Sequence, residues 1–247
     1  MQVTLQKRFS GGGNFAASYT WSKFIADTDG TDATGMEPTG VAAIQDFTNL
    51  RNSRSLLSFD VPQRLTLSYT YDLPVGKGKR FLGNISQGAD RVLGGWGLNG
   101  ITIIQSGFPL IFTSVAPSQI SGFGFGTLRP NVAVGWNKTI PGALETHLNQ
   151  VFNTACFSAP SPYGLGDEAR TDPNLRDAGI NNWDVSVFKL IPFSERIRMQ
   201  FCAEFFNIAN RVQFGNPRTA IGSPSFGIIS SQLNQPRLIQ LALRLSF

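Results

Sequence analysis

The strongest constraint on the fold of this chain is a repeated two-residue alternation of apolar and polar side chains. In residues 239–247 an apolar side chain occupies every second position, and polar or small side chains occupy the positions between them. A period of two is typical of a β-strand whose two faces meet different surroundings. The segments with this pattern are residues 2–9, 14–24, 64–73, 96–106, 182–190, 196–207 and 239–247.

The length of these segments indicates the medium that surrounds them. A tilted strand needs about 9–11 residues to cross a bilayer, whereas strands of soluble proteins usually have about 5–6. Most of the segments reach the longer value. Segment 96–106 is the least regular, because Ile101, Ile103 and Ile104 blur its alternation. A β-bulge or an unusually apolar wall would explain this irregularity.

The connections between the segments alternate between short and long. The first is a turn at residues 11–13, and the fifth is a turn at residues 191–195. The fourth connection, residues 107–181, is rich in Gly, Pro and Asn, and so long an irregular loop is uncommon in a compact soluble domain. Bacterial outer-membrane barrels have short periplasmic turns and long outer loops. The chain is therefore predicted to be all-β: about seven antiparallel transmembrane strands of an up-and-down barrel with long extracellular loops.

Composition agrees with a β protein that has one face in a nonpolar medium. Charged residues make up 15% of the chain, below the roughly 25% of soluble domains. The net charge of +5 comes from scattered basic residues, which favours turn and lumen charges over a nucleic-acid surface. The chain does not begin with the basic and apolar regions of a signal peptide, so we expect it to be a piece of a longer exported protein.

Two sets of apolar residues are candidates for contacts with the membrane and its assembly machinery. Aromatic side chains gather at membrane interfaces, and this topology puts Trp183 and Phe205 near the outer rim and Trp96 and Tyr71 near the periplasmic rim. A soluble fold would instead make them core aromatics. The second set lies on the terminal strand: Leu241, Leu243, Leu245 and Phe247.

Residues suited to catalysis or metal binding are few. His147 is the one histidine of the chain, which leaves little basis for a Ser-His or His-based metal site. Cys156 and Cys202 do not form a zinc pattern, and we favour unpaired thiols over a disulfide. The glycine-rich residues 122–126 lack phosphate-loop spacing and favour a flexible outer loop over a ligand clamp.

Two groups of acidic residues could supply oxygen ligands to a calcium ion, although ordinary solvated loops are favoured for both. The first group is Asp27, Asp29 and Asp32, and the second is Asp167, Glu168, Asp172 and Asp177. We therefore expect no enzyme activity, no cofactor and no metal site. The ligand-binding residues are not predicted.

A family resemblance rests on an ordered set of short blocks. They are residues 18–23, 59–64, 71–80, 95–101, 105–109, 152–157, 182–189, 198–210 and 243–247. The set resembles the last part of the barrel of a TonB-dependent outer-membrane transporter, of the Oar-like type that often carries a carboxypeptidase-regulatory-like domain. The resemblance implies a barrel of about 22 strands around a plug, with these strands as the last seven. It also implies ligand import powered from the inner membrane.

Residues 1–247 would then be one C-terminal barrel segment, with the plug and the N-terminal regions outside the sequence. The expected partners are outer-membrane lipid, the remaining N-terminal part of the same barrel and, through the absent plug, the inner-membrane energising protein. The terminal aromatic Phe247 resembles the signal that the barrel-assembly machinery recognises. The alternative is a structural or adhesion barrel with partner-binding loops, and a soluble β-sandwich is the third possibility. The imported ligand, whether sugar, peptide or chelated metal, stays open.

Overall fold

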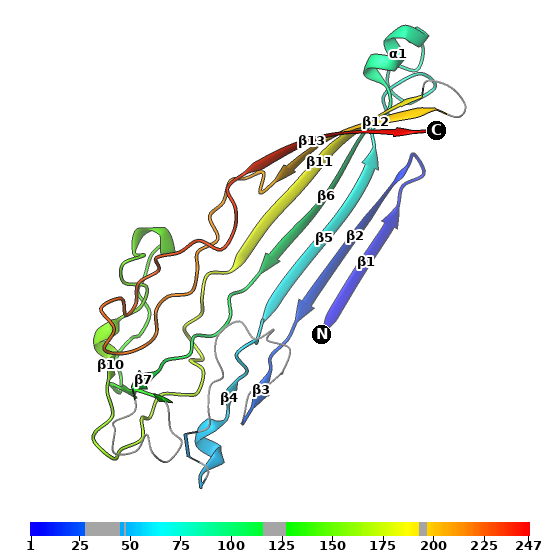
Figure 1. Ribbon diagram of the computed structural model, residues 1–247. Coiled ribbons are helices and arrows are strands. Elements are labelled where there is room, and N and C mark those ends of the chain that lie inside the picture. The colour runs from blue at the N-terminus through cyan, green and yellow to red at the C-terminus, as the bar shows by residue number, and fades with distance from the viewer. Residues whose placement is uncertain (28–44, 47, 116–126, 193–196) are drawn as a thin grey trace.

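A computed structural model describes residues 1–27, 45–46, 48–115, 127–192 and 197–247. One antiparallel sheet of seven strands dominates it, and the strands follow each other across the sheet in chain order (Figure 1). They are β1 (Gln2–Arg8), β2 (Gly13–Trp21), β5 (Gln63–Asp72), β6 (Trp96–Gln105), β11 (Ile180–Pro192), β12 (Arg198–Phe206) and β13 (Leu238–Ser246). These strands confirm the seven segments expected from the alternation.

Unbroken pairing carries the alternation across the whole sheet, because residues that face each other on neighbouring strands share a face. One row of facing residues on the first face is Lys7, Phe15, Tyr69, Gly100, Val185, Phe205 and Ile239. The adjacent row on the second face is Arg8, Asn14, Thr70, Asn99, Ser186, Glu204 and Gln240. We call the first face the apolar face and the second face the polar face. Seven locally amphipathic strands thus combine into one two-sided wall.

The pairing is also staggered. Arg8 ends β1, whereas Gln240 is the third residue of β13, although a single row of facing residues joins them. A row that starts beside the first turn therefore finishes beside the last long loop. Such a shift of register accompanies the tilt of strands in a barrel wall. The sheet thus has the stagger of a barrel.

The irregular β6 contains no bulge, since its pairing with both neighbours is continuous. Ile101 and Ile103 lie on the polar face, so this part of the wall is unusually apolar. Glycines leave room for rings from the adjacent strands: a Cβ on Gly97 would meet the ring of Phe188, and a Cβ on Gly100 would lie 2.6 Å from the Tyr69 hydroxyl. The Tyr69 ring thus completes the apolar face beside Gly100, whereas the Phe188 ring adds a further apolar group to the polar face beside Gly97.

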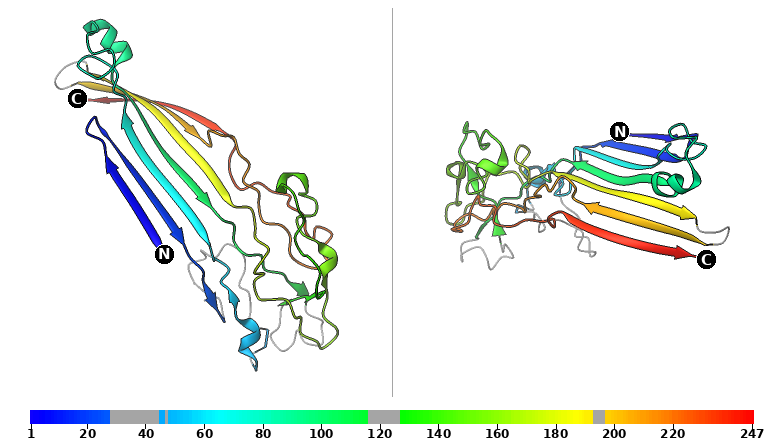
Figure 2. Two further views of the ribbon diagram at one scale, coloured as in Figure 1. Left: turned by 180° about the vertical axis from the view of Figure 1, so that it is seen from behind. Right: turned by 90° about the horizontal axis from the view of Figure 1, so that it is seen from above.

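The connections separate into two ends (Figure 2). The β1–β2 turn, the β5–β6 connection, the end of β11 and the start of β12 lie at one end, which we call the short-turn end. The β5–β6 connection there contains the helix α1 (Gln87–Leu93), which the sequence analysis did not predict; Ser86 caps it by accepting a hydrogen bond from the amide of Ala89. Within the residues described, no helix is long and apolar enough to cross a membrane.

The other end, which we call the long-loop end, is folded. Its short elements are β3 (Ile25–Ala26), η1 (Leu50–Ser53), β4 (Ser55–Leu56), β7 (Ser114–Val115), β8 (Thr127–Leu128), β9 (Asn131–Val132), η2 (Leu144–Thr146), η3 (Thr154–Cys156) and β10 (Phe157–Ser158). A small hydrophobic core holds them together: Leu110, Phe112, Phe152, Cys156, Phe157 and Leu175, with Phe226 packed against it. The rings of Phe112 and Phe157 are stacked, with centroids 4.3 Å apart. The loops therefore build a second packed layer.

The outer edges of the sheet are unpaired in the part of the chain that the structure describes. β1 and β13 each pair on one side, with β2 and with β12. All residues of both strands are exposed. Open edges carry unsatisfied backbone groups, which a hydrocarbon medium does not tolerate. Both edges therefore offer backbone groups with which a further strand could pair.

Candidate functional site

The apolar face presents its aromatic residues toward both ends of the strands. Trp183 and Phe205 lie toward the long-loop ends of β11 and β12. Trp96 begins β6 and Tyr71 nearly ends β5, so both lie at the short-turn end. Each ring has a defined neighbour: the Trp183 indole donates to Oδ1 of Asn181 at 2.8 Å, and Tyr71 packs edge-on against Phe9. Such ring belts are typical of membrane interfaces.

A lysine anchors the short-turn end of the apolar face. Nζ of Lys189 donates to the carbonyl oxygens of Val92 at 2.9 Å and Gly94 at 2.6 Å, and it lies 4.8 Å from the centroid of the Trp96 ring. The Trp96 indole itself donates to the Val92 carbonyl at 3.1 Å. These contacts fix the end of α1 against β6 and β11. A charged side chain at a membrane rim is acceptable because its head group is satisfied in this way.

The terminal strand β13 is fully open to the surroundings. Its alternating apolar side chains Leu241 and Leu243 are each 67% exposed, and Phe247 beyond the strand is 97% exposed. They align with Ala203 and Phe201 of β12 on the apolar face. An edge strand of this kind is a template for pairing with another chain or another strand.

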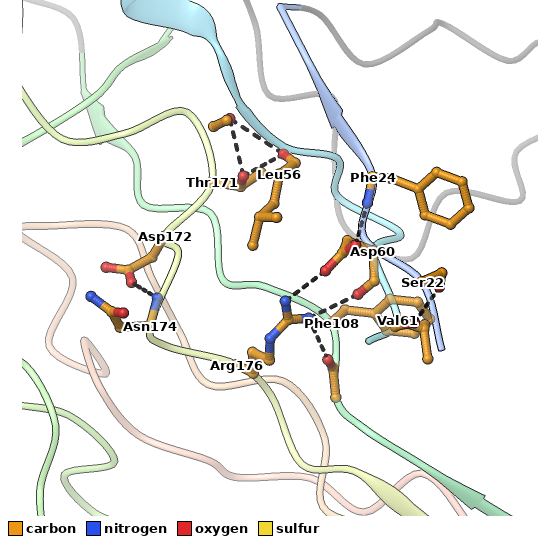
Figure 3. A network of polar contacts seen from close by, with 12 residues as sticks. Ser22, Phe24, Leu56, Asp60, Val61, Phe108, Thr171, Asp172, Asn174 and Arg176 are labelled. Carbon is orange, nitrogen blue, oxygen red and sulfur yellow. Dashed lines mark hydrogen bonds and ion pairs between the residues drawn. The ribbon is translucent and has the colours of Figure 1, made fainter. Parts of the chain in front are cut away.

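At the long-loop end, ion pairs and hydrogen bonds connect loops that are far apart in sequence (Figure 3). Nη2 of Arg176 lies 2.6 Å from Oδ2 of Asp60, and Nη1 of Arg176 donates to the carbonyl oxygens of Asp60 and Gly107. The other carboxylate oxygen of Asp60 accepts from the Phe24 amide at 2.7 Å. Asp60 is only 1% exposed, so its charge depends on these donors. Together these contacts join two connections, the one between β2 and β5 and the one between β6 and β11.

A second ionic cluster buries two acidic residues of the fourth connection that were expected in solvent, whereas Asp167 of the same group is exposed as expected. Nζ of Lys138 pairs with carboxylate oxygens of both Glu168 and Asp172, and the two acids are 3% and 0% exposed. Burial and the neighbouring Asp172 charge raise the pKa of Glu168. Burial opposes the charge of Lys138, but the hydrogen bond and charge of Asp172 outweigh it and raise the lysine pKa. The cluster is therefore a buried ion-pair network that joins two parts of the connection between β6 and β11.

The same connection contributes a buried arginine. Arg170 is 1% exposed, and its guanidinium donates to the carbonyl oxygens of Ser53, Ala26 and Leu56. These carbonyls belong to the connection between β2 and β5, more than a hundred positions earlier in the chain. The loop layer is thus closed by charged groups as well as by its aromatic core.

A groove of about 570 Å³ lies along the polar face, where the β12–β13 connection meets the long-loop ends of β5, β6 and β11. Its lining includes five apolar residues, Ile103, Ile180, Phe206, Pro236 and Leu238. Most of the remaining lining is carboxamide: Gln105, Asn182, Asn207, Gln213, Asn234, Gln235 and Gln240. Arg64 and Asp184 supply its charged groups. We call this the loop-roofed groove.

The other candidate residues do not come together. His147 lies in the loop layer, where its Nδ1 contacts the Thr146 hydroxyl at 3.2 Å. Cys156 belongs to the loop core and Cys202 to β12, and both thiols are free. Asp27 forms an exposed pair with Arg54 at 3.8 Å. Among the described residues no group of His, Cys, Asp or Glu could hold a metal ion. Asp29, Asp32 and residues 122–126 lie outside the described residues.

The residues that sequence reasoning missed are those of the loop-roofed groove and the loop ties. Their signal in the sequence is weak, because an isolated Arg or Gln in a polar segment resembles any solvated residue. Gln105 and Arg64 stand opposite each other on neighbouring strands, a relation that only the register reveals. The strand alternation could have assigned Arg64 to the polar face, whereas Gln105 shares its face with Ile101 and Ile103 and is placed only by the register.

These observations define a class of protein. A staggered antiparallel sheet with one apolar face, short turns at one end and long folded loops at the other is the wall of an outer-membrane β-barrel. The chain belongs to the outer membrane beta barrel domain family, whose family model matches residues 1–240. Its location is therefore the bacterial outer membrane. No curated protein and no solved structure matches the chain.

Proposed function

We propose that the chain is part of a TonB-dependent outer-membrane receptor of the Oar-like type, which imports a ligand and carries out no enzymatic reaction. The observation that carries the proposal is the loop-roofed groove. It lies on the polar face, which faces the lumen in a closed barrel, and outer-loop residues form part of its lining. A ligand that enters between the loops would reach this groove first. The ordered sequence blocks that resemble this receptor type support the same reading.

The proposal assigns the partners as well. The edges of β1 and β13 would be completed by further strands of the same barrel, and the apolar face would contact outer-membrane lipid. The barrel-assembly machinery would bind β13 through its exposed leucines and Phe247. The inner-membrane energising protein would act through a plug that lies outside these residues. The packed loop layer would hold the entrance of the barrel in shape.

A test starts from the protein as it occurs in the outer membrane. An antibody raised against residues 207–237 captures it, and mass spectrometry gives its intact mass and its peptides. We expect a mass roughly three times the 26.9 kDa of these residues, because a transporter barrel has about 22 strands and a plug. We also expect crosslinking in intact cells to join the protein to the energising protein of the inner membrane.

The alternative, a structural or adhesion barrel, has a distinct outcome in the same experiment. The loop layer exposes large apolar side chains, with Val134 95% exposed and Trp136 59% exposed, which a surface partner could cover. A large barrel without a plug and without the crosslink would favour adhesion. An intact mass of 26.9 kDa would refute the transporter reading.

A further inference from the structure

We infer that the loop-roofed groove binds a short peptide with a free carboxylate, an inference that rests on the proposed function and names its ligand class. The groove's volume of about 570 Å³ falls within the roughly 300–1,000 Å³ of small-molecule sites. A peptide of two or three residues is of this order of size. The inference depends on three groups of residues: amides and a cation that have no partner within the described residues, and an aliphatic floor.

The amides come first, because buried polar groups are usually hydrogen-bonded. Gln105 is only 9% exposed and lines the groove, yet its side chain has no hydrogen-bond partner in the described part of the chain. The half-buried Gln213 also lines the groove with a side chain that is unbonded there, and the unbonded side chains of Gln235 and Gln240 are exposed along it. Each carboxamide offers both donors and an acceptor, the same complement as a peptide group. The amides are therefore available to a ligand.

Other amides of the groove are already used, which separates the framework from the available groups. The side-chain amide of Asn207 donates to the carbonyls of Arg211 and Gln235, and Oδ1 of Asn234 accepts from the backbone N–H of Gln213. These bonds brace the β12–β13 connection internally, and the backbone amide of Asn207 attaches it to Asp184 on the polar face. The roof is consequently built before any ligand arrives, which lowers the entropic cost of binding.

The charged residues Arg64 and Asp184 would set the orientation of a bound peptide. Arg64 lies on the polar face of β5, opposite Gln105, and no carboxylate of the described residues pairs with it. A guanidinium suits a carboxylate, which it can bind through two parallel hydrogen bonds. Asp184 is held in place, with Oδ1 accepting from the Asn207 amide and Oδ2 accepting from Asn182. Its remaining lone pairs could accept from the amino end of the peptide.

The floor of the groove distinguishes a peptide from a sugar. Ile103, Ile180 and Leu238 are aliphatic, and Phe206 is the one aromatic residue of the groove's lining. An aliphatic surface gains free energy by covering an apolar side chain, which a peptide carries and a simple oligosaccharide lacks. Phe206 is 38% exposed and could cover one side chain of the ligand.

The test measures binding without import, on outer-membrane fractions from cells that express the protein. The probe is tritiated Ala-Leu-Ala, and the competitors are its C-terminal amide and maltotriose. We expect saturable binding of the acid, with the amide competing about tenfold or more weakly, since a hydrogen bond to a charged group is worth about 1.5–3 kcal/mol. Maltotriose should not compete.

Matched variants assign the contacts. Arg64→Gln should weaken binding of the acid about tenfold or more and leave the amide unchanged. Its control is Arg244→Gln, since Arg244 lies on the polar face of β13 near the short-turn end. Gln105→Leu should weaken both probes, whereas Gln200→Leu on β12 should weaken neither. Arg64→Lys and Gln235→Ala keep the test valid if a first variant fails to assemble, and immunoblots give the amount of protein.

The outcomes are distinct from those of the function test. Equal affinity for the acid and the amide, equal effects of Arg64→Gln and Arg244→Gln, or displacement by maltotriose would each overturn the peptide assignment. Absence of saturable binding in membranes that contain the assembled protein would also overturn it. Binding as expected without crosslinking to the energising protein would refute the transporter alone.

Discussion

Replacement of Arg176 by Met is the most direct test of how the outer loops are held. The substitution removes the cation that pairs with Asp60 at 2.6 Å and leaves that carboxylate 1% exposed before any relaxation. Breaking a buried pair costs about 3–5 kcal/mol, because one uncompensated charge remains. The arginine side chain is itself 21% exposed, so water can partly replace it and we expect the lower value, about 3 kcal/mol.

This loss of free energy can be measured as a change in the rate of amide hydrogen exchange. A loss of about 3 kcal/mol raises the population of the opened loop roughly a hundredfold, and exchange of the amides near residues 55–62 should accelerate by a similar factor. The measurement is exchange with mass spectrometry on the protein in its membrane. The second half of the double-mutant cycle is Asp60→Asn, which keeps an acceptor for the Phe24 amide.

The control is the exposed pair between Arg54 and Asp27, at 3.8 Å and with side chains 68% and 51% exposed. Exposed pairs contribute about 0–1 kcal/mol, so Arg54→Met should change exchange by less than about fivefold. If Arg176→Met accelerates exchange no more than Arg54→Met does, the loops are not held by this buried ion pair. The explanation for their order would then be the aromatic core alone.

Three further predictions concern the sheet, the outer loops and the terminal strand. Gly97→Ala should destabilise the protein by about 1–3 kcal/mol in a urea titration, because its Cβ would lie 2.6 Å from Cε2 of Phe188. The control Gly11→Ala places its Cβ in open space and should change stability little. Equal effects of the two substitutions would contradict this prediction. Burial raises the pKa of Asp177 from 3.8 to about 6, so the folded state binds this proton more tightly than the unfolded state does. The stability of the loops should therefore fall as the pH rises between these two values. If Asp177→Asn leaves this pH dependence unchanged, the prediction is refuted. Deletion of Phe247 should lower the amount of assembled protein in pulse-labelled outer membranes, and an undiminished amount would exclude an assembly role.

The proposal for the groove and the prediction for the loops are physically connected. The β12–β13 connection that roofs the groove also packs Phe226 against the loop core. The backbone amide of Ile221 donates to the carbonyl oxygen of Thr113, which joins this connection to the one between β6 and β11. Loosening the loop layer should therefore weaken ligand binding at a distance from Arg64. Arg176→Met tests this coupling when it is assayed with the tritiated peptide.

The sequence by itself determined the wall. Alternation is a local property, since successive side chains of a strand point to opposite faces, and it is therefore readable without knowledge of contacts. The strand segments, the two kinds of connection and the candidate aromatics all followed from it. The resemblance extended this reading to a receptor type, which stays a proposal.

Only the tertiary structure decided what the loops do. Phe112 and Phe157 stack although they are far apart in sequence, and Arg170 binds the carbonyl of Ser53 across 117 positions. Such contacts leave no periodic signal, and this is why Glu168 and Asp172 were expected in solvent. The groove has the same origin: Arg64 and Gln105 become neighbours through the register of two strands, and the connection above them covers both. Pairing across strands and packing between distant loops are properties of the folded chain, so the wall could be predicted and the site could not.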